Sequence, residues 1–268
     1  MQEAKRNVTS ENDLQKIKEL RLMDDDFFSE ALDGKTKAVE YILNTILERD
    51  DIKVKSTKAQ VEYKSVTKRS IKLDIQAEDV NGRLMDIEIQ RSDRGSGVRR
   101  ARFHSSMIDR ALLSKGDDFE DLVDTYVIFI TEKDKFGMGV PLYHIERRIK
   151  EMDNALFGDG AHILYVNGEY RNLEHPVGSL MHDFNCKDAK DMVNPLLAEE
   201  VRYLKETEGG RSQMSRILEE MRNEVAEKEK VNTALKMLAR GRDSIEEIAE
   251  ITGLSLEEVM KLADNQKG

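Results

Sequence analysis

Cysteine, tryptophan and proline are scarce in this sequence. Its 268 residues include one cysteine, no tryptophan and three prolines. A single cysteine excludes an intrachain disulfide, and we expect Cys186 to be a small, half-buried side chain rather than a catalytic thiol. Because the polar N-terminus also lacks the apolar core of a signal peptide, the sequence predicts a reducing, cytoplasmic setting.

Long apolar runs and an excess of basic residues are also missing. No stretch approaches the roughly 18 apolar residues of a membrane-spanning helix, so we expect no membrane partner. Lys and Arg total 43 against 53 Asp and Glu, which gives a formal net charge of -10. This balance argues against non-specific nucleic-acid binding by the whole molecule, although it allows a local basic patch.

Three regions follow one another along the chain. Residues 1–20 are polar and predict a frayed or loosely helical segment. Residues 21–193 mix helix and strand patterns, whereas residues 194–268 have the pattern of charged helices. We therefore expect one α/β domain with a helical C-terminal extension.

Two alternating segments flank the dipeptide Asn81-Gly82. Residues 71–76 and 85–90 each alternate apolar and polar side chains. Asn-Gly tolerates the positive φ angles of a type I′ turn, so the pattern predicts a β-hairpin.

The polar face of this hairpin gathers carboxylates. Side chains two apart on a strand share a face, so Asp86, Glu88 and Gln90 point one way, and Asp74 lies on the polar face of the neighbouring strand. Carboxylate oxygens from adjacent strands are suitable ligands for a hard cation such as Mg²⁺. A half-solvated antiparallel sheet shows the same alternation, and from this pattern alone that alternative is favoured. We expect Asp86 to be solvated.

The middle region predicts a mixed α/β sheet. Helical spacing covers residues 27–47, with a break at Gly34, and residues 97–114. An extended segment precedes the hairpin, and the apolar run 126–130 indicates a fully buried strand. The resulting αβββαβ order contains a helical crossover after the hairpin, which is typical of mixed α/β folds.

Eight stretches in this order carry a family resemblance. They are Asp25-Asp26-Phe27-Phe28, Ile71-Lys72-Leu73-Asp74-Ile75, Asp79-Val80-Asn81-Gly82-Arg83, Ile87-Glu88-Ile89-Gln90-Arg91, Arg100-Ala101-Arg102-Phe103-His104, Leu113-Ser114-Lys115-Gly116-Asp117-Asp118-Phe119, Tyr126-Val127-Ile128-Phe129-Ile130 and Ile248-Ala249-Glu250-Ile251-Thr252-Gly253-Leu254-Ser255. The set resembles the PD-(D/E)XK nuclease superfamily and, more narrowly, the Rpn family of recombination-promoting nucleases and transposases. The resemblance covers roughly residues 22 to 262.

The resemblance implies a metal-dependent DNA endonuclease that hydrolyses phosphodiester bonds, with a link to recombination or mobile elements. It assigns the catalytic positions to Asp74, Glu88 and Gln90. Asp74 and Glu88, with the backbone carbonyl of Ile89, are implied to hold Mg²⁺ or Mn²⁺, so we expect their face to open to solvent. Gln90 stands where the superfamily usually has Lys, and its uncharged amide can only orient water or donate a hydrogen bond.

A basic segment follows the hairpin. Arg guanidinium groups match phosphate oxygens, and a helix start adds free amides. We therefore expect DNA phosphate contacts from Arg91, Arg94, Arg99, Arg100 and Arg102. A solvated basic turn that pairs with the acidic remainder of the chain is the alternative.

The first helix offers further acids. Asp25, Asp26 and Glu30 are candidates for an additional acidic residue at the site. For Asp25 and Asp26 we favour the alternative, in which they stabilise the start of the helix through its free amides and dipole. His104 could face the cleft, but a structural role is the commoner outcome for a lone histidine.

The C-terminal region predicts two features. Apolar positions from Met214 to Leu235 recur at spacings of four and three, interrupted by Lys228 and Asn232, which is typical of a weak coiled coil and hence of a homodimer. An amphipathic helix that lies on its own domain is an equal alternative. Capping boxes at Ser244 and Ser255 predict two short helices that resemble part of a helix-turn-helix. The second of these helices begins with acidic residues, which favours packing or partner binding over DNA recognition.

Two other functions stay open at this stage. A non-catalytic nucleic-acid-binding or scaffolding protein on a nuclease fold predicts salt-sensitive, metal-independent DNA binding. An oligomerisation module in the C-terminal helices predicts that removing residues 194–268 changes the mass in solution and leaves DNA handling intact.

Overall fold

The computed structural model describes residues 10–64, 70–91 and 96–265. The chain forms two compact units, Met1–Met214 and Ser215–Gly268. Helix α6 (Pro195–Glu206) belongs to the first unit, so the boundary predicted at residue 194 falls inside that unit.

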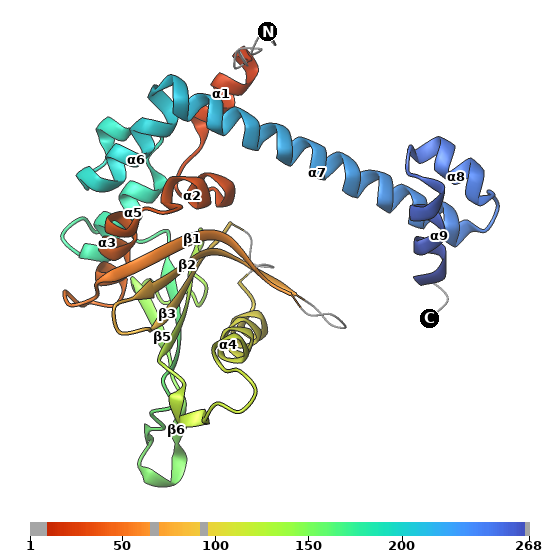
Figure 1. Ribbon diagram of the computed structural model, residues 1–268. Helices are drawn as coiled ribbons and strands as arrows, with labels where there is room; N and C mark the ends of the chain where they lie inside the picture. Colours follow the sequence, from red (N-terminus) through yellow and green to blue (C-terminus); the bar gives the residue numbers. More distant parts are fainter. Residues whose placement is uncertain (1–9, 65–69, 92–95, 266–268) are drawn as a thin grey trace. The chain divides into compact units, whose positions relative to one another are not determined.

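A six-stranded mixed sheet organises the first unit, with the strand order β1-β2-β3-β4-β8-β5 (Figure 1). The strands are β1 (Val54–Tyr63), β2 (Ile71–Asp79), β3 (Leu84–Gln90), β4 (Thr125–Thr131), β5 (Leu142–Ile145) and β8 (Ala161–Asn167). The first three are antiparallel neighbours, β3, β4 and β8 run parallel, and β5 pairs antiparallel with β8 at the edge. The predicted mixed α/β fold is confirmed.

Strand β4 lies in the middle of the sheet because its sequence is apolar on both faces. All seven of its residues are buried. A strand that is paired in parallel on both sides and covered on both faces needs such a continuous apolar run. The run at residues 126–130 thus marked the centre of the fold correctly.

Helices cover both faces of this sheet. In Figure 1, α4 (Val98–Leu112) lies on one side, and α2 (Asp25–Leu32), α3 (Thr36–Ile46) and α5 (Pro176–Asn185) lie on the other. Gly34 separates α2 from α3 with a φ of +70°, a conformation that favours glycine. Aromatic rings join α2 to α5, since the centroids of Phe28 and Phe184 lie 5.8 Å apart.

A buried lysine ties the N-terminal helix α1 (Glu11–Glu19) to this unit. The ammonium group of Lys205 in α6 donates to the carbonyl oxygens of Lys18, Leu20 and Lys187. Its Nζ also lies 5.3 Å from the ring centroid of Phe27. Three acceptors offset the desolvation of the charge, which is what a buried cation requires.

Shorter elements complete the first unit. Strands β6 (Arg148–Ile149) and β7 (Ala155–Leu156) form a separate ribbon that projects beyond the sheet in Figure 1. Single turns of 3₁₀ helix occur at Phe119–Asp121, Lys150–Met152 and Ala189–Asp191.

The second unit contains α7 (Glu208–Arg240) from Ser215 onward, together with α8 (Ile245–Thr252) and α9 (Leu256–Asn265). Both predicted capping boxes form, because Ser244 and Ser255 exchange hydrogen bonds with Glu247 and Glu258. The buried side chains of this unit form a small hydrophobic core, which consists of Ala234, Ile248, Leu254 and Val259. None of the helices among the described residues is long and apolar enough to cross a membrane.

Candidate active site

An aspartate organises the turn between β2 and β3. The Oδ1 atom of Asp79 accepts hydrogen bonds from the amides of Asn81 and Arg83, each at 2.9 Å, and the Asp79 carbonyl accepts from Gly82 N at 3.1 Å. Gly82 has a φ of +80°, whereas Asn81 is not among the described residues with positive φ. The hairpin is therefore confirmed, but the type I′ turn was wrong: a type I turn followed by a left-handed glycine forms instead.

The alternation of side chains breaks where β2 reaches Asp74. Leu73 packs in one apolar cluster with Val127, which the register of the sheet places on the same face as Gln76. Strict alternation would put Leu73 and Gln76 on opposite faces. Across from Asp74 in the register, Gln60 of β1 has a φ of +56°, which is uncommon for a residue with a Cβ. The irregular backbone thus coincides with the first predicted metal ligand.

Next to Asp74, side-chain carboxylates replace the backbone hydrogen bonds between β2 and β3. The paired register of β2 and β3 ends at Ile75 and Ile87. Beyond it, Asp74 Oδ2 accepts from Ile89 N at 2.9 Å, and Glu88 Oε1 accepts from Asp74 N at 3.1 Å. These reciprocal bonds bring Asp74, Glu88 and the backbone of Ile89 together.

Both carboxyl groups are buried, contrary to the expectation of an open face. Asp74 is 7% exposed and Glu88 is fully buried. Burial, followed by the charge of Glu88, raises the pKa of Asp74 to about 9. Burial, followed by the charge of Asp86, raises the pKa of Glu88 to about 8. Carboxylates this close in a dry site need a proton or a cation between them.

Asp86 extends this cluster, and its predicted exposure to solvent was wrong. Its side chain is fully buried, because α4 covers this face of the sheet and places His104 against it. The Nδ1 atom of His104 lies 3.1 Å from Asp86 Oδ2 and 3.9 Å from Glu88 Oε1. Burial raises the pKa of Asp86 well above its ordinary value.

The tautomer of His104 follows from its other neighbour. Arg100 Nε donates to His104 Nε2 at 3.2 Å, and a guanidinium group cannot accept a hydrogen bond. Nε2 must therefore be unprotonated, so Nδ1 carries the hydrogen and donates to Asp86. Packing against Phe129, with ring centroids 5.7 Å apart, holds the imidazole in this orientation.

Arg100 has a different partner from the predicted DNA phosphate. Its Nη2 atom lies 3.1 Å from Glu88 Oε2. The Arg100 side chain is 39% exposed, although the carboxylate that it contacts is fully buried. Within the described residues, Arg100 is thus a positive charge that contacts the predicted site and also faces solvent.

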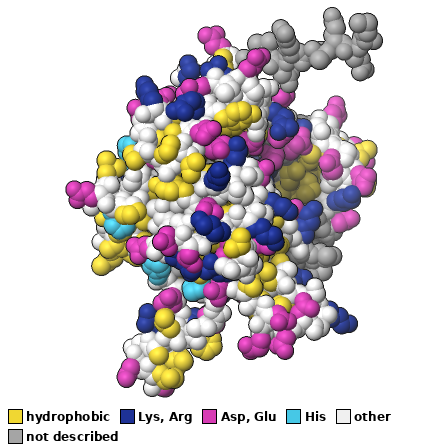
Figure 2. All heavy atoms as spheres, turned by 60° about the vertical axis from the view of Figure 1, so that its left-hand side comes forward, with side chains coloured by type: hydrophobic (Ala, Val, Ile, Leu, Met, Phe, Trp, Pro, Cys, Tyr) yellow, Lys and Arg dark blue, Asp and Glu magenta, His cyan; other side chains and the backbone are white. Residues whose placement is uncertain are grey.

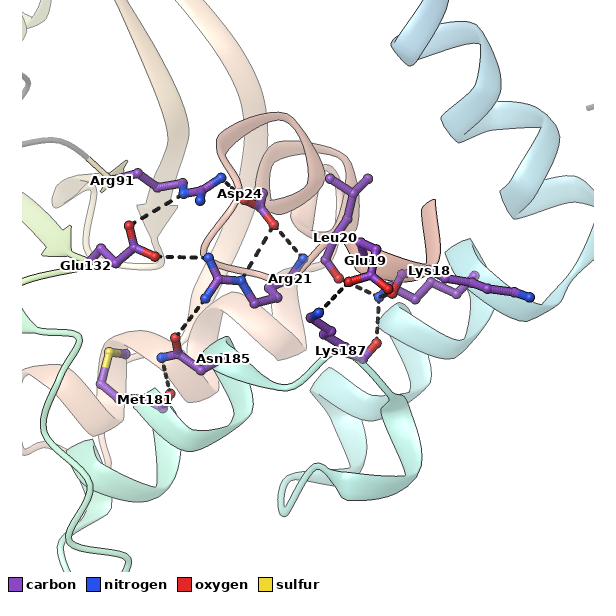
Figure 3. Close-up of polar contacts among 11 residues, drawn as sticks. Lys18, Glu19, Leu20, Arg21, Asp24, Arg91, Glu132, Met181, Asn185 and Lys187 are labelled. Atoms are coloured by element: carbon purple, nitrogen blue, oxygen red, sulfur yellow. Dashed lines mark hydrogen bonds and ion pairs between the residues drawn. The ribbon is translucent and has the colours of Figure 1, made fainter. Parts of the chain in front are cut away.

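The other predicted phosphate contacts are more dispersed. Figure 3 shows Arg91 between Asp24 and Glu132, at 2.6 Å and 3.6 Å. Arg99 and Arg102 are exposed on α4, and Arg94 lies outside the described residues. On the face shown in Figure 2, acidic and basic side chains are interspersed.

Among the candidate acids of the first helix, Asp25 lies at the site. The side chain of Asp25 hydrogen-bonds that of Asp74 and contributes to its raised pKa. Asp25 and Asp26 both lie in the first turn of α2, as the alternative for them required. Glu30 instead accepts a hydrogen bond from Gln213.

Gln90 ends β3 beside the carboxylates. Its backbone carbonyl accepts from Glu132 N at 3.0 Å, and its side chain is partly buried. With no charge of its own, Gln90 leaves the cationic role at this site to another residue.

The donor atoms present fit a divalent metal ion. Asp74, Glu88 and the Ile89 carbonyl offer oxygen ligands, which suit Mg²⁺ and Mn²⁺. In addition, Oδ1 of Asp86 is buried without a hydrogen-bond partner, so this oxygen is available as a further ligand. Asp86, Glu88 and His104 also offer ligand atoms within 4.8 Å of one another, but the Nδ1 atom of His104 carries a proton where such an ion would bind.

Comparison with known families identifies the family of the domain that carries this site. The family model for "PD-(D/E)XK nuclease family transposase" matches residues 26–173, a span that includes the hairpin, α4 and the parallel strands. Searches of curated proteins and of solved structures each found no match. On the family match and the arrangement of its sheet, this nuclease-like chain belongs to the PD-(D/E)XK nuclease family transposases.

Proposed function

We propose that the protein is a metal-dependent DNA endonuclease. The observation that carries this proposal is the pair Asp74 and Glu88, which exchange hydrogen bonds with each other's strand where the β2–β3 ladder ends. Two buried carboxylates with raised pKa values form a site that a divalent cation stabilises.

In this proposal Asp74, Glu88 and the carbonyl of Ile89 hold Mg²⁺ or Mn²⁺. When bound, such an ion lowers the pKa of a water molecule and polarises the scissile phosphate. Gln90 orients the attacking water through its amide, because it cannot act as a base at neutral pH. Exposed Arg99 and Arg102, near the start of α4, contact the DNA backbone through the paired N–H donors of their guanidinium groups.

DNA binding without catalysis is the second candidate. The burial of Glu88 beneath Arg100 favours it, because substrate and metal must displace or pass this contact. A scaffold of this kind binds DNA in a salt-sensitive manner that EDTA does not affect.

Cleavage of supercoiled plasmid DNA with Mg²⁺ or Mn²⁺ tests the proposal. We expect nicking by the wild type and a loss of about 100-fold or more in Asp74→Asn and Glu88→Gln, since each removes a metal ligand. Asp50→Asn, which changes an exposed carboxylate, is the matched control. Equal nicking by the two site variants and the wild type, with all proteins folded, would rule out the assignment. Salt-sensitive DNA binding without nicking by the wild type would favour the second candidate.

A further inference from the structure

A chain of hydrogen bonds runs from a buried carboxylate to the surface of the site. Asp86 accepts from His104 Nδ1 at 3.1 Å, and His104 Nε2 accepts from Arg100 Nε at 3.2 Å. Arg100 Nη2 then donates to Glu88 Oε2 at 3.1 Å. Every bond in this chain has one possible direction, because Arg100 can only donate.

The chain fixes the position of a charge. Asp86 and His104 are almost completely buried, and the ring is packed on Phe129. Arg100, four residues before His104 on α4, is held on the same helical face. A long, flexible side chain is thus aligned by two rigid buried groups, which lowers the entropic cost of using it.

We propose that Arg100 is the resident cation of this site, with His104 and Asp86 as its positioning residues. This inference rests on the proposed endonuclease function. Without metal, the guanidinium donates a hydrogen bond to Glu88 Oε2. With metal and DNA bound, Arg100 turns its remaining N–H donors toward the negative charge that develops on the scissile phosphate.

Three observations support this role. Gln90 brings no charge to the end of β3. The contacts of Arg100 with Glu88 and His104 use Nη2 and Nε, while a guanidinium has five N–H donors, so further donors are left for an anion. The Arg100 side chain is 39% exposed beside a fully buried carboxylate, so an approaching phosphate meets it first.

Arg100→Ala provides a test with two readouts of opposite sign. We expect single-turnover cleavage to fall about 100-fold, because a preorganised charge is lost. We also expect Mn²⁺ to bind about tenfold more tightly in calorimetry, because no cation competes for Glu88. Arg110→Ala, an exposed arginine near the end of the same helix, is the control.

Relocating the charge separates this role from a structural one. In Arg100→Ala, the added substitution Gln90→Lys should restore cleavage by about tenfold, because it returns a cation to the site. If Arg100→Ala weakens Mn²⁺ binding, or if Gln90→Lys restores nothing, the proposal is overturned.

The positioning residues are tested by a double-mutant cycle. His104→Ala should slow cleavage in the wild-type background and add little in Arg100→Ala, because it acts through Arg100. Fully additive effects would show that His104 acts independently and would overturn its assigned role.

Failure of the endonuclease function is distinguishable from failure of this inference. If the wild type cleaves no DNA, the proposed function is wrong. The Mn²⁺ titration alone then tests whether Arg100 is the resident cation. Tighter binding by Arg100→Ala still supports Arg100 as the resident cation, whereas unchanged or weaker binding overturns it.

Discussion

The buried carboxyl groups should make the metal-free protein sensitive to pH. The pKa of Asp74 is raised to about 9 and that of Glu88 to about 8, whereas unfolded carboxyl groups titrate near pH 4. Across the window between, the folded site therefore holds protons that the carboxyl groups of the unfolded chain have released. Their contribution to stability is fully present below about pH 4 and is lost as the pH rises through the folded values.

The size of the effect follows from proton linkage. Each group lowers the free energy of unfolding by about 1.4 kcal/mol per pH unit inside this window. Over the two pH units between 5.5 and 7.5, one such proton lowers it by about 3 kcal/mol, which is a large share of the stability of many domains. Asp74→Asn removes one of the two contributions. Its amide oxygen can still accept from Ile89 N, so the variant keeps the local fold.

Urea unfolding in EDTA across this pH range measures the slope. The difference between the slopes of Asp74→Asn and the wild type separates the coupled site from all other titrating residues, and we expect about 1.4 kcal/mol per pH unit for the proton that the variant no longer binds. Asp50→Asn, at an exposed position, is the control for the loss of a carboxyl group. Added Mn²⁺ should flatten the wild-type slope, because it favours the ionised carboxylates. Identical slopes for the wild type and Asp74→Asn would refute the reasoning.

Three other predictions concern packing and assembly. Lys205→Met leaves three carbonyl oxygens without their donor and should destabilise the fold by about 3 kcal/mol or more in urea unfolding, while exposed Lys190→Met should not. Gly178→Ala would place a Cβ 1.9 Å from the Asn172 carbonyl oxygen, so we expect a lower melting temperature and a loss of about 1–3 kcal/mol, and an unchanged melting temperature would contradict the close approach. If the exposed Met221 on α7 contributes to a homodimer, Met221→Lys should shift analytical ultracentrifugation profiles from dimer to monomer, and a monomeric wild type would exclude that dimer.

The sequence predicted the parts of the site that depend on local pattern. Alternation located the hairpin, and its spacing placed Asp74 and Glu88 on neighbouring strands. The break in alternation at Asp74 was not predictable, because Gln60 gives no sign of the left-handed backbone that glycine or asparagine would suggest. Local pattern therefore placed the two carboxylates on neighbouring strands, and the family resemblance singled them out as candidate ligands, but neither predicted the backbone that holds them.

The contact between α4 and the sheet was missed for a different reason. Asp86 follows the pattern of a solvated strand position, and only the crossover helix shows that this face is covered. One signal was present: Arg100 and His104 are four apart, so a helix over 97–114 puts them on one face. Combined with a helical crossover that packs on the sheet, this spacing could have directed both toward the acids.

Gln90 and Arg100 are best understood together. A lysine at position 90 would place a second cation next to Glu88, which Arg100 already contacts. Two cations at one carboxylate would repel each other and compete with a divalent ion for the same oxygens. An uncharged side chain at the end of β3 avoids that competition, while α4 supplies one oriented charge. The neutral residue is therefore consistent with a site whose cation comes from the helix, so the absence of a strand lysine does not by itself indicate that the site is inactive.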